Sequence, residues 1–161
     1  MTAAPASAAG EPPRIVLDTN VVLDWLYFRD ARCSALADAI ASRRVRWIAS
    51  APMRDEIEHV LGRGRLGTRW PEGPSSVRDG WQRWATMVEA TTDAPTPLGM
   101  RCTDPDDQKF IDLALGSRAV ALLSADRAVL KLARRASAWG LAITTAAAWP
   151  TMPPLAPAEK P

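Results

Sequence analysis

Cysteine and histidine are scarce in this sequence. Its 161 residues include two cysteines, Cys33 and Cys102, and one histidine, His59. One isolated cysteine pair does not make a disulfide scaffold, and no CxxC spacing indicates structural zinc, so we expect reduced thiols in a cytoplasmic protein. A Ser-His-Asp triad would have to depend on His59, which the helix pattern places on a polar side, so that chemistry fits poorly.

Long apolar runs and common ligand-binding loops are also missing. No run approaches the roughly 18 apolar residues that span a bilayer, and residues 1–13 lack the basic start and apolar stretch of a secretory signal. The phosphate loop GxxxxGK[ST] does not occur. Residues 104–109 (DPDDQK) lack the glycine and terminal glutamate of a calcium-binding EF-hand loop.

What is present fits one soluble globular domain. Hydrophobic residues make up 47% of the chain and charged residues 24%, and 161 residues suffice for a full hydrophobic core. Residues 1–13 and 150–161 are rich in alanine and proline, which oppose regular structure, so both segments are expected to be flexible tails. The domain then spans residues 14–149.

Apolar runs alternate with helical patterns between the two tails. The predicted strands are 14–17, 45–49, 119–123 and 141–144. The predicted helices are 21–28, 31–41, 50–61 with Ser50 as N-cap, 75–90, 105–117 and 126–135. Residues 62–74 form a glycine-, arginine- and proline-rich loop, and residues 91–103 are irregular with room for one short strand. This alternation predicts an α/β fold with a parallel sheet, whose binding sites lie at the carboxyl ends of the strands.

Asp107 is an acid on an apolar helix face. At about 100° per residue, the helix 105–117 places it near the middle of the face that carries Phe110, Ile111 and Ala114. A carboxylate there costs free energy unless a cation or hydrogen bonds compensate it. Helix capping would explain a neighbouring acid such as Asp104 equally well, but it does not explain the inward direction of Asp107.

Glu56 is the acid of helix 50–61 that borders the apolar stripe of Met53, Ile57 and Val60. It is therefore the best candidate on this helix for an acid that leans inward. An ordinary glutamate at the rim of the stripe is the alternative, and it would be preferred if Glu56 were considered alone.

Asp18 and Asp126 each come directly after a predicted strand. For Asp18 the alternative is a turn-forming role, and for Asp126 it is a helix N-cap. With Asp107 and Glu56 they make four inward or strand-end carboxylates. Two carboxylates about 4 Å apart repel by roughly 4 kcal/mol at an effective dielectric near 20. Such a cluster requires protonation or a bound cation, and oxygen ligands favour hard ions such as Mg²⁺ or Mn²⁺.

Arginine is concentrated between residues 43 and 83, and arginine forks onto phosphate. Solvated helix faces explain any single arginine at least as well. As a group they are compatible with a nucleic-acid surface, to which Trp70 would add base stacking, although packing or a protein contact explains Trp70 equally well. The candidate nucleic-acid-binding residues are Arg43, Arg44, Arg63, Arg65, Arg69 and Trp70.

Four segments in this order and spacing resemble the PIN domain family, the nuclease fold of many bacterial toxins. They are VLDTNVVLDWL (16–26), S-x5-E from Ser50 to Glu56, DPDDQKFIDLAL (104–115) and LLSADRAVL (122–130). The resemblance covers about residues 14–149 and is to a branch related to the shorter VapC-type proteins. It implies a single three-layer α/β/α domain with a central parallel sheet and an acidic pocket.

The resemblance also implies roles for individual residues. By position, Asp18, Glu56, Asp107 and Asp126 match the four acids that bind the metal and carry catalysis. Asn20 and Ser124 match accessory polar positions, and Asp104 is expected to assist through water.

The implied function is an Mg²⁺- or Mn²⁺-dependent endoribonuclease, the toxin of a type II toxin–antitoxin system, that leaves 5′-phosphate and 3′-hydroxyl ends. The implied partners are an RNA substrate, a cognate antitoxin and a second copy of the chain. One alternative is a catalytically degenerate PIN module that binds RNA or a partner protein, although all four acids are present. The other is a haloacid-dehalogenase-type phosphatase, whose chemistry wants an acid where this sequence has Asn20.

Overall fold

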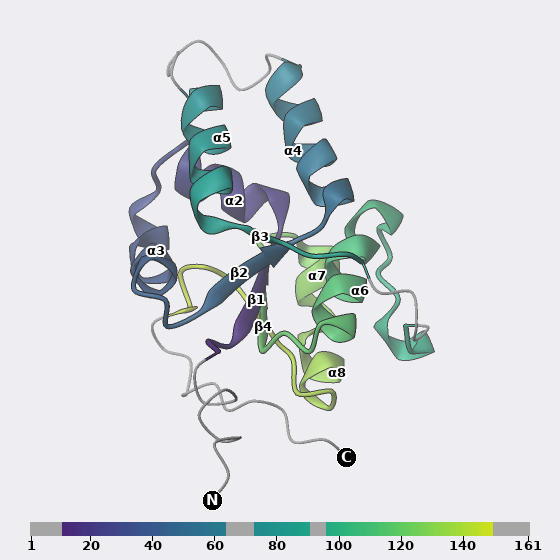
Figure 1. Cartoon of the computed structure of the whole chain (residues 1–161). Helices are drawn as coiled ribbons and strands as arrows, with labels where there is room; N and C mark the ends of the chain where they lie inside the picture. Colours follow the sequence, from purple (N-terminus) through teal and green to yellow (C-terminus); the bar gives the residue numbers. More distant parts are fainter. Residues whose placement is uncertain (1–10, 64–72, 91–95, 150–161) are drawn as a thin grey trace, which may run out of the picture.

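A parallel sheet of five strands forms the centre of the molecule (Figure 1). The computed structural model describes residues 11–63, 73–90 and 96–149. The strand order is β3-β2-β1-β4-β5, and every described strand pair is parallel. The strands are β1 (Arg14–Leu17), β2 (Arg46–Ala49), β3 (Thr86–Met87), β4 (Ala121–Leu123) and β5 (Ala142–Thr144). The α/β fold with a central parallel sheet is confirmed.

Helices connect the strands and cover both faces of the sheet. They are α2 (Thr19–Leu26), α3 (Ser34–Ala41), α4 (Ala51–Gly62), α5 (Gly73–Trp84), α6 (Gln108–Gly116), α7 (Arg127–Leu130) and α8 (Ala133–Ser137). Short 3₁₀ turns are η1 (Ala31–Cys33), η2 (Leu98–Met100) and η3 (Pro105–Asp107). In Figure 1, α3 lies on one side of the sheet and α6 and α8 on the other. Among the described residues, no helix has both the length and the apolar character to cross a membrane.

The strand order reverses direction next to β1. The chain moves outward from β1 to β2 and β3, then returns to place β4 on the other side of β1. Right-handed crossovers put the connecting helices of these two halves on opposite faces of the sheet. The carboxyl ends of β1 and β4 therefore flank the switch point, which is the usual ligand-binding place in an open parallel sheet.

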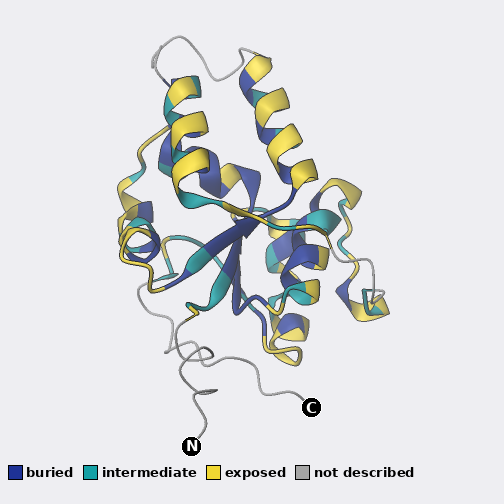
Figure 2. Cartoon of the chain, viewed as in Figure 1, coloured by how far each residue is buried: buried dark blue, intermediate teal, exposed yellow. Residues whose placement is uncertain are grey.

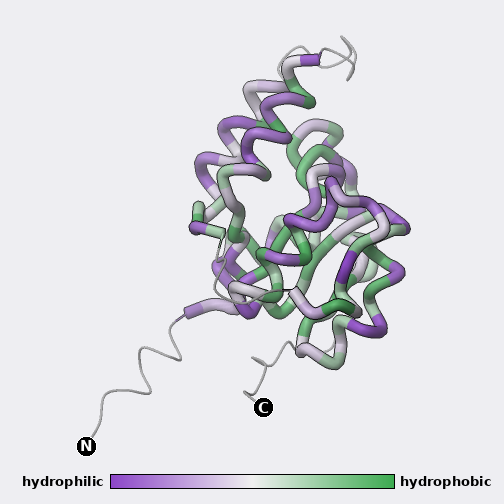
Figure 3. The backbone as a smooth tube through the Cα atoms, turned by 90° about the vertical axis from the view of Figure 1, so that its right-hand side faces the viewer, coloured by the Kyte–Doolittle hydropathy of each residue, from purple (hydrophilic) through white to green (hydrophobic). Residues whose placement is uncertain are grey.

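The strands are buried and apolar, as a sheet covered on both faces requires. Three buried or half-buried tryptophans pack edge to face beside β2, with centroid distances of 5.7 Å for Trp25–Trp47 and 4.9 Å for Trp47–Trp81. Figure 2 shows the buried residues along the strands and the inner helix faces, and Figure 3 shows hydrophobic segments gathered there. Helices α4 and α5 project from this core and carry mostly exposed residues on their outer faces.

The helix predicted over residues 75–90 is confirmed as far as Trp84 and wrong for residues 85–90. The helix there starts at Gly73 and ends at Trp84, and residues Thr86–Met87 form strand β3. This strand exists because β2 has a free edge: the Val88 amide donates to the Ala49 carbonyl at 2.9 Å, and Ile48 pairs with Thr86. Both β3 side chains are exposed, so no apolar alternation marks the strand in the sequence.

Three predicted helices are divided in the structure. The helix predicted over 31–41 begins as the 3₁₀ turn η1 and becomes α-helical at Ser34. The helix predicted from Pro105 begins as the 3₁₀ turn η3 and becomes α-helical at Gln108. The helix predicted over 126–135 is two short helices, α7 and α8. Elsewhere the predicted strands and helices are confirmed to within a few residues at each end.

Three arginines of the described segments adopt the left-handed conformation shortly after a helix. Their φ angles are 51° for Arg29, 60° for Arg43 and 54° for Arg118. After α3, the Arg44 amide donates to the Ala39 carbonyl at 2.9 Å, and after α6 the Ala119 amide donates to Ala114 at 2.9 Å. This bond pattern closes a helix end, and glycine is the residue that usually occupies the left-handed position.

Candidate metal centre

Asp18 leaves β1 at the switch point and is almost fully buried, with 3% of its surface exposed. Its amide donates to the Leu123 carbonyl at 2.9 Å, which continues the β1–β4 ladder by one residue. It is the N-cap of α2: its Oδ1 accepts from the Asn20 amide at 3.3 Å. The turn-forming role and the inward position thus hold together, because the strand end directs the side chain into the molecule.

Ser124 joins the acids that follow β1 and β4. Its hydroxyl donates to Asp18 Oδ2 at 2.6 Å and accepts from the Asp126 amide at 3.0 Å. Asp126 in turn caps α7, where its Oδ1 accepts from the Ala128 amide at 2.8 Å. Capping uses one carboxylate oxygen of Asp126, so this role is compatible with a second one for the other oxygen.

Three aspartates come together beside Asp18. Asp104, Asp107 and Asp126 each offer a carboxylate oxygen within 4.8 Å of the others. Asp104 is the N-cap of η3 and accepts from the Asp106 amide at 3.0 Å. The 3₁₀ turn that follows brings Asp107 to the same point, three residues later along the chain. This arrangement joins a loop acid, a helix-start acid and a strand-end acid in one cluster.

Asp107 is the acid of this cluster whose charge is least compensated. Its side chain is 9% exposed, and its Oδ2 is buried without a hydrogen-bond partner among the described residues. Burial raises the pKa of Asp107 to about 7, helped by a hydrogen bond with Asp126 and by repulsion from Asp18, Asp126 and Asp104. The inward direction predicted from the helix pattern is confirmed by this burial.

The surroundings of Asp18 also disfavour its charged form. Burial raises the pKa of Asp18, and repulsion from Glu56 and Asp126 adds to the rise, while the hydrogen bonds from Ser124 and Asn20 oppose it. Carboxylate oxygens are the ligands that Mg²⁺ and Mn²⁺ prefer. A divalent cation would pair the free oxygen of Asp107 and offset the mutual repulsion, so the residues present fit such an ion.

Glu56 lies at the same edge, half-buried on α4. One oxygen, Oε1, accepts from Lys109 Nζ at 2.8 Å, and the other accepts a short hydrogen bond from the Thr19 hydroxyl. Neither Thr19 nor Lys109 was predicted from the sequence as a site residue. Thr19 lies within the segment VLDTN and Lys109 within DPDDQKF, so their place in these motifs was the signal that could have identified them.

The structure brings five acids together near the carboxyl ends of the strands: Asp18, Glu56, Asp107, Asp126 and Asp104. Asn20 is different: its side chain is exposed, and its described contact with the site is the backbone bond to Asp18.

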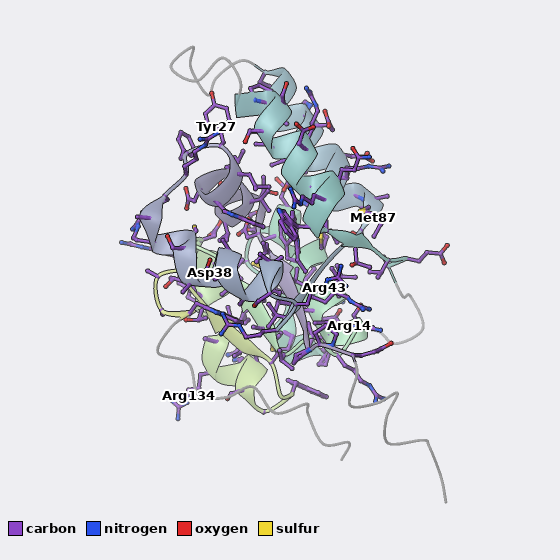
Figure 4. All side chains as sticks on the ribbon, turned by 60° about the vertical axis from the view of Figure 1, so that its left-hand side comes forward. Arg14, Tyr27, Asp38, Arg43, Met87 and Arg134 are labelled. Atoms are coloured by element: carbon purple, nitrogen blue, oxygen red, sulfur yellow. The ribbon has the colours of Figure 1, made fainter. Side chains whose placement is uncertain are left out.

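Arg43 and Arg44 lie at the opposite edge of the sheet from the acids. Both are exposed in the turn before β2, and Arg14, which starts β1, pairs in register with Arg46. In the view of Figure 4, Arg14 and Arg43 are both labelled below Tyr27. The acids follow the strands, so a strand of four residues, about 13 Å, separates the two edges.

Arg63 follows the last residue of α4, which leads away from the acidic edge. Gly62 also begins a GxGxxG spacing over residues 62–67, but it ends a helix, whereas a dinucleotide loop follows a strand.

Three of the candidate nucleic-acid residues lie outside the described residues: Arg65, Arg69 and Trp70.

Comparison with known proteins gives a family match and a similar fold. The sequence profile of the PIN domain matches residues 14–128. A chain in the crystal structure of VapBC2 from Rickettsia felis, bound to a DNA fragment from their promoter, is similar in fold, with a TM-score of 0.57. The two chains are 11% identical, and the alignment covers 81% of this chain and 96% of the other. No curated protein matches the sequence.

The family profile spans well over half of the chain and contains every acid of the cluster described above. The fold similarity is independent of that profile, and it also indicates a five-stranded parallel sheet flanked by helices. The protein belongs to the PIN domain family.

Proposed function

We propose that this protein is an endoribonuclease that hydrolyses RNA phosphodiesters with Mg²⁺ or Mn²⁺. The single observation that carries the proposal is the unpartnered, buried oxygen of Asp107 beside Asp104 and Asp126. A buried oxygen without a partner costs free energy. A folded protein retains such a group when a ligand or the chemistry of the site compensates it.

Asp18, Asp107 and Asp126 would hold the ion, with Asp104 assisting through water. A divalent ion at this place supplies an activated water and neutralises charge on the scissile phosphate. Ser124 orients this set, because its hydroxyl fixes Asp18 while it receives the amide of Asp126. Glu56 completes the acidic site from α4. If hydrolysis follows the family pattern, the RNA products would carry 5′-phosphate and 3′-hydroxyl ends.

The proposed biological role is that of the toxin in a toxin–antitoxin pair. The support is the family membership and the fold similarity to a chain of VapBC2. We expect the product of an adjacent gene to co-purify with this chain and to suppress its ribonuclease activity. Co-expression of the two genes followed by size-exclusion chromatography tests this role and also gives the oligomeric state, which we propose to be a homodimer.

The enzymatic proposal is tested with the Asp18→Asn variant. Cleavage of a defined single-stranded RNA by wild-type protein should require added Mn²⁺ and stop with chelator, and the variant should lose it by at least about a hundredfold. Asp55→Asn is the matched control, because Asp55 is exposed on α4, outside the cluster. Circular dichroism would confirm that both variants are folded.

Two outcomes would overturn the proposal. A folded protein that binds RNA but neither Mn²⁺ nor Mg²⁺ would be a catalytically inactive PIN module. Transfer of phosphate onto Asp18 would instead make the protein a phosphatase. The burial of Asp18, which is 3% exposed, disfavours the second outcome, since a nucleophilic carboxylate must come into line with the phosphorus atom.

A further inference from the structure

Glu56 differs from the aspartates of the site in having a lysine partner: among the described residues, its ion pair with Lys109 is the one salt bridge made by a site acid. Oε1 accepts from Lys109 Nζ and Oε2 from the Thr19 hydroxyl. We propose that Lys109 and Thr19 are positioning residues that hold Glu56 off the cation, so that the aspartates alone bind it. This inference rests on the proposed metal-dependent function and concerns which acidic residues bind the cation.

The contacts of Glu56 come from three different elements. Thr19 is the first residue of α2, Glu56 lies in α4, and Lys109 lies in the first turn of α6. We call these three residues the Glu56 clamp. Two opposed donors fix the carboxylate in one orientation, and turning it toward an ion would require breaking at least one of these bonds. Asp107 has no such barrier within the described part of the chain, where its Oδ2 has no hydrogen-bond partner.

Lys109 is itself held in place. Its Nζ donates to the Asp106 carbonyl at 2.5 Å and lies 4.9 Å from the centre of the Phe110 ring. The side chains of Lys109 and Glu56 are 25% and 28% exposed, so the pair is partly screened from water. The ammonium group is thus fixed beside Glu56 rather than free to follow an approaching phosphate.

The clamp changes the charge that a cation meets. Lys109 offsets the charge of Glu56, and the negative potential of the site then comes from Asp18, Asp104, Asp107 and Asp126. Two roles for Glu56 can therefore be separated. If it is a direct ligand, its loss weakens metal binding whether or not Lys109 is present. If it belongs to the clamp, removing both partners together leaves the aspartate site as it was.

Calorimetric titration with Mn²⁺ alone, without RNA, distinguishes these roles. Lys109→Met should bind Mn²⁺ about three- to tenfold more tightly than wild type, because a nearby positive charge is gone and Glu56 is released. Glu56→Gln should bind more weakly by a similar factor, because Lys109 is then unpaired. The double variant should return to within about threefold of wild type. Lys131→Met, an exposed lysine with the same change in net charge, is the control and should change the dissociation constant by less than about twofold.

A double variant that stays more than about thirtyfold weaker than wild type would show that Glu56 is a ligand and would overturn the inference. Thr19 gives a second, independent variant pair. Thr19→Ser keeps the hydroxyl and should retain wild-type Mn²⁺ affinity, whereas Thr19→Val releases one oxygen of Glu56 and should bind Mn²⁺ more tightly. Equal behaviour of the Ser and Val variants would remove Thr19 from the clamp.

Urea unfolding without metal keeps this inference separate from the proposed function. Glu56→Gln and Lys109→Met should be non-additive by about threefold in the unfolding equilibrium constant, as expected of a partly exposed ion pair. Additive effects would overturn the clamp even in a protein that binds Mn²⁺. Failure of the wild type to bind Mn²⁺ would instead overturn the proposed function, while the unfolding measurement still decides whether the clamp exists.

Discussion

Asp107 contributes to the pH dependence expected of the metal-free protein in the same direction as the buried Asp18. The pKa of Asp107 is raised by burial to about 7 in the folded state, while the unfolded chain has the ordinary value of 3.8. Between these two values the unfolded chain has lost its proton and the folded protein keeps it. The contribution of Asp107 to stability should therefore fall as pH rises from about 4 to about 7, by at most about 4 kcal/mol, and change little above that range. Urea unfolding in chelator at pH 5 and pH 8 measures this, and equal stabilities after correction for other groups would contradict it.

Removing the charge of Asp107 should stabilise the fold and abolish metal binding together. Asp107→Asn eliminates a buried anion next to Asp18 and Asp126, so the metal-free free energy of unfolding at pH 8 should rise by about 1–3 kcal/mol. Mn²⁺ titration of the same variant should show no binding. Asp55→Asn should alter neither quantity. A destabilised Asp107→Asn variant would mean that the carboxylate serves the fold rather than an ion.

The residues of the site differ in how far the sequence predicts them. Asp107 follows from helix periodicity, because Phe110, Ile111 and Ala114 define the buried face. Asp18 and Asp126 follow from their place after apolar strands. Thr19 and Lys109 do not follow, since their contacts with Glu56 join three elements that meet only after folding.

At the scale of elements, the packing of α5 on α2 depends on a glycine. A Cβ added at Gly73 would lie 2.2 Å, 2.6 Å and 2.8 Å from three ring atoms of the buried Tyr27. Gly73→Ala should therefore destabilise the protein by about 1–3 kcal/mol. Thermal unfolding measures the effect. Gly62→Ala is the control, because no described atom outside its own helix lies within 4 Å of its Cβ position, and it should leave stability unchanged or raise it by up to about 1 kcal/mol.

Elements were predictable where burial imposes a pattern. The four longer strands are apolar runs, and α4 begins where Ser50 and Pro52 indicate a helix start, although Ser50 caps without a side-chain bond. Strand β3 was not predictable, because two exposed residues carry no pattern and their pairing depends on the free edge of β2. The arginines named as phosphate contacts show the same limit, since sequence spacing does not reveal that Arg43 and Arg44 lie at the edge opposite the acids.

At the scale of the whole molecule, a bound cation should raise the melting temperature. A ligand at a hundred times its dissociation constant stabilises the folded state by about 2.7 kcal/mol, which corresponds to roughly 5–10 °C for a chain of this length. Calorimetry with Mn²⁺ and with chelator measures the difference. Asp18→Asn should show a much smaller shift, and an equal shift in that variant would place the ion elsewhere.

The left-handed arginines after α2, α3 and α6 have a consequence for anyone who engineers this chain. Replacing Arg29, Arg43 and Arg118 with glycine would remove the steric cost of a positive φ angle at three helix ends, which is a common way to raise thermal stability. The same triple replacement would remove three positive charges and take the formal net charge from +2 to −1. The gain in heat tolerance would then be accompanied by a reversed overall sign, and with it a weaker long-range attraction for any polyanion.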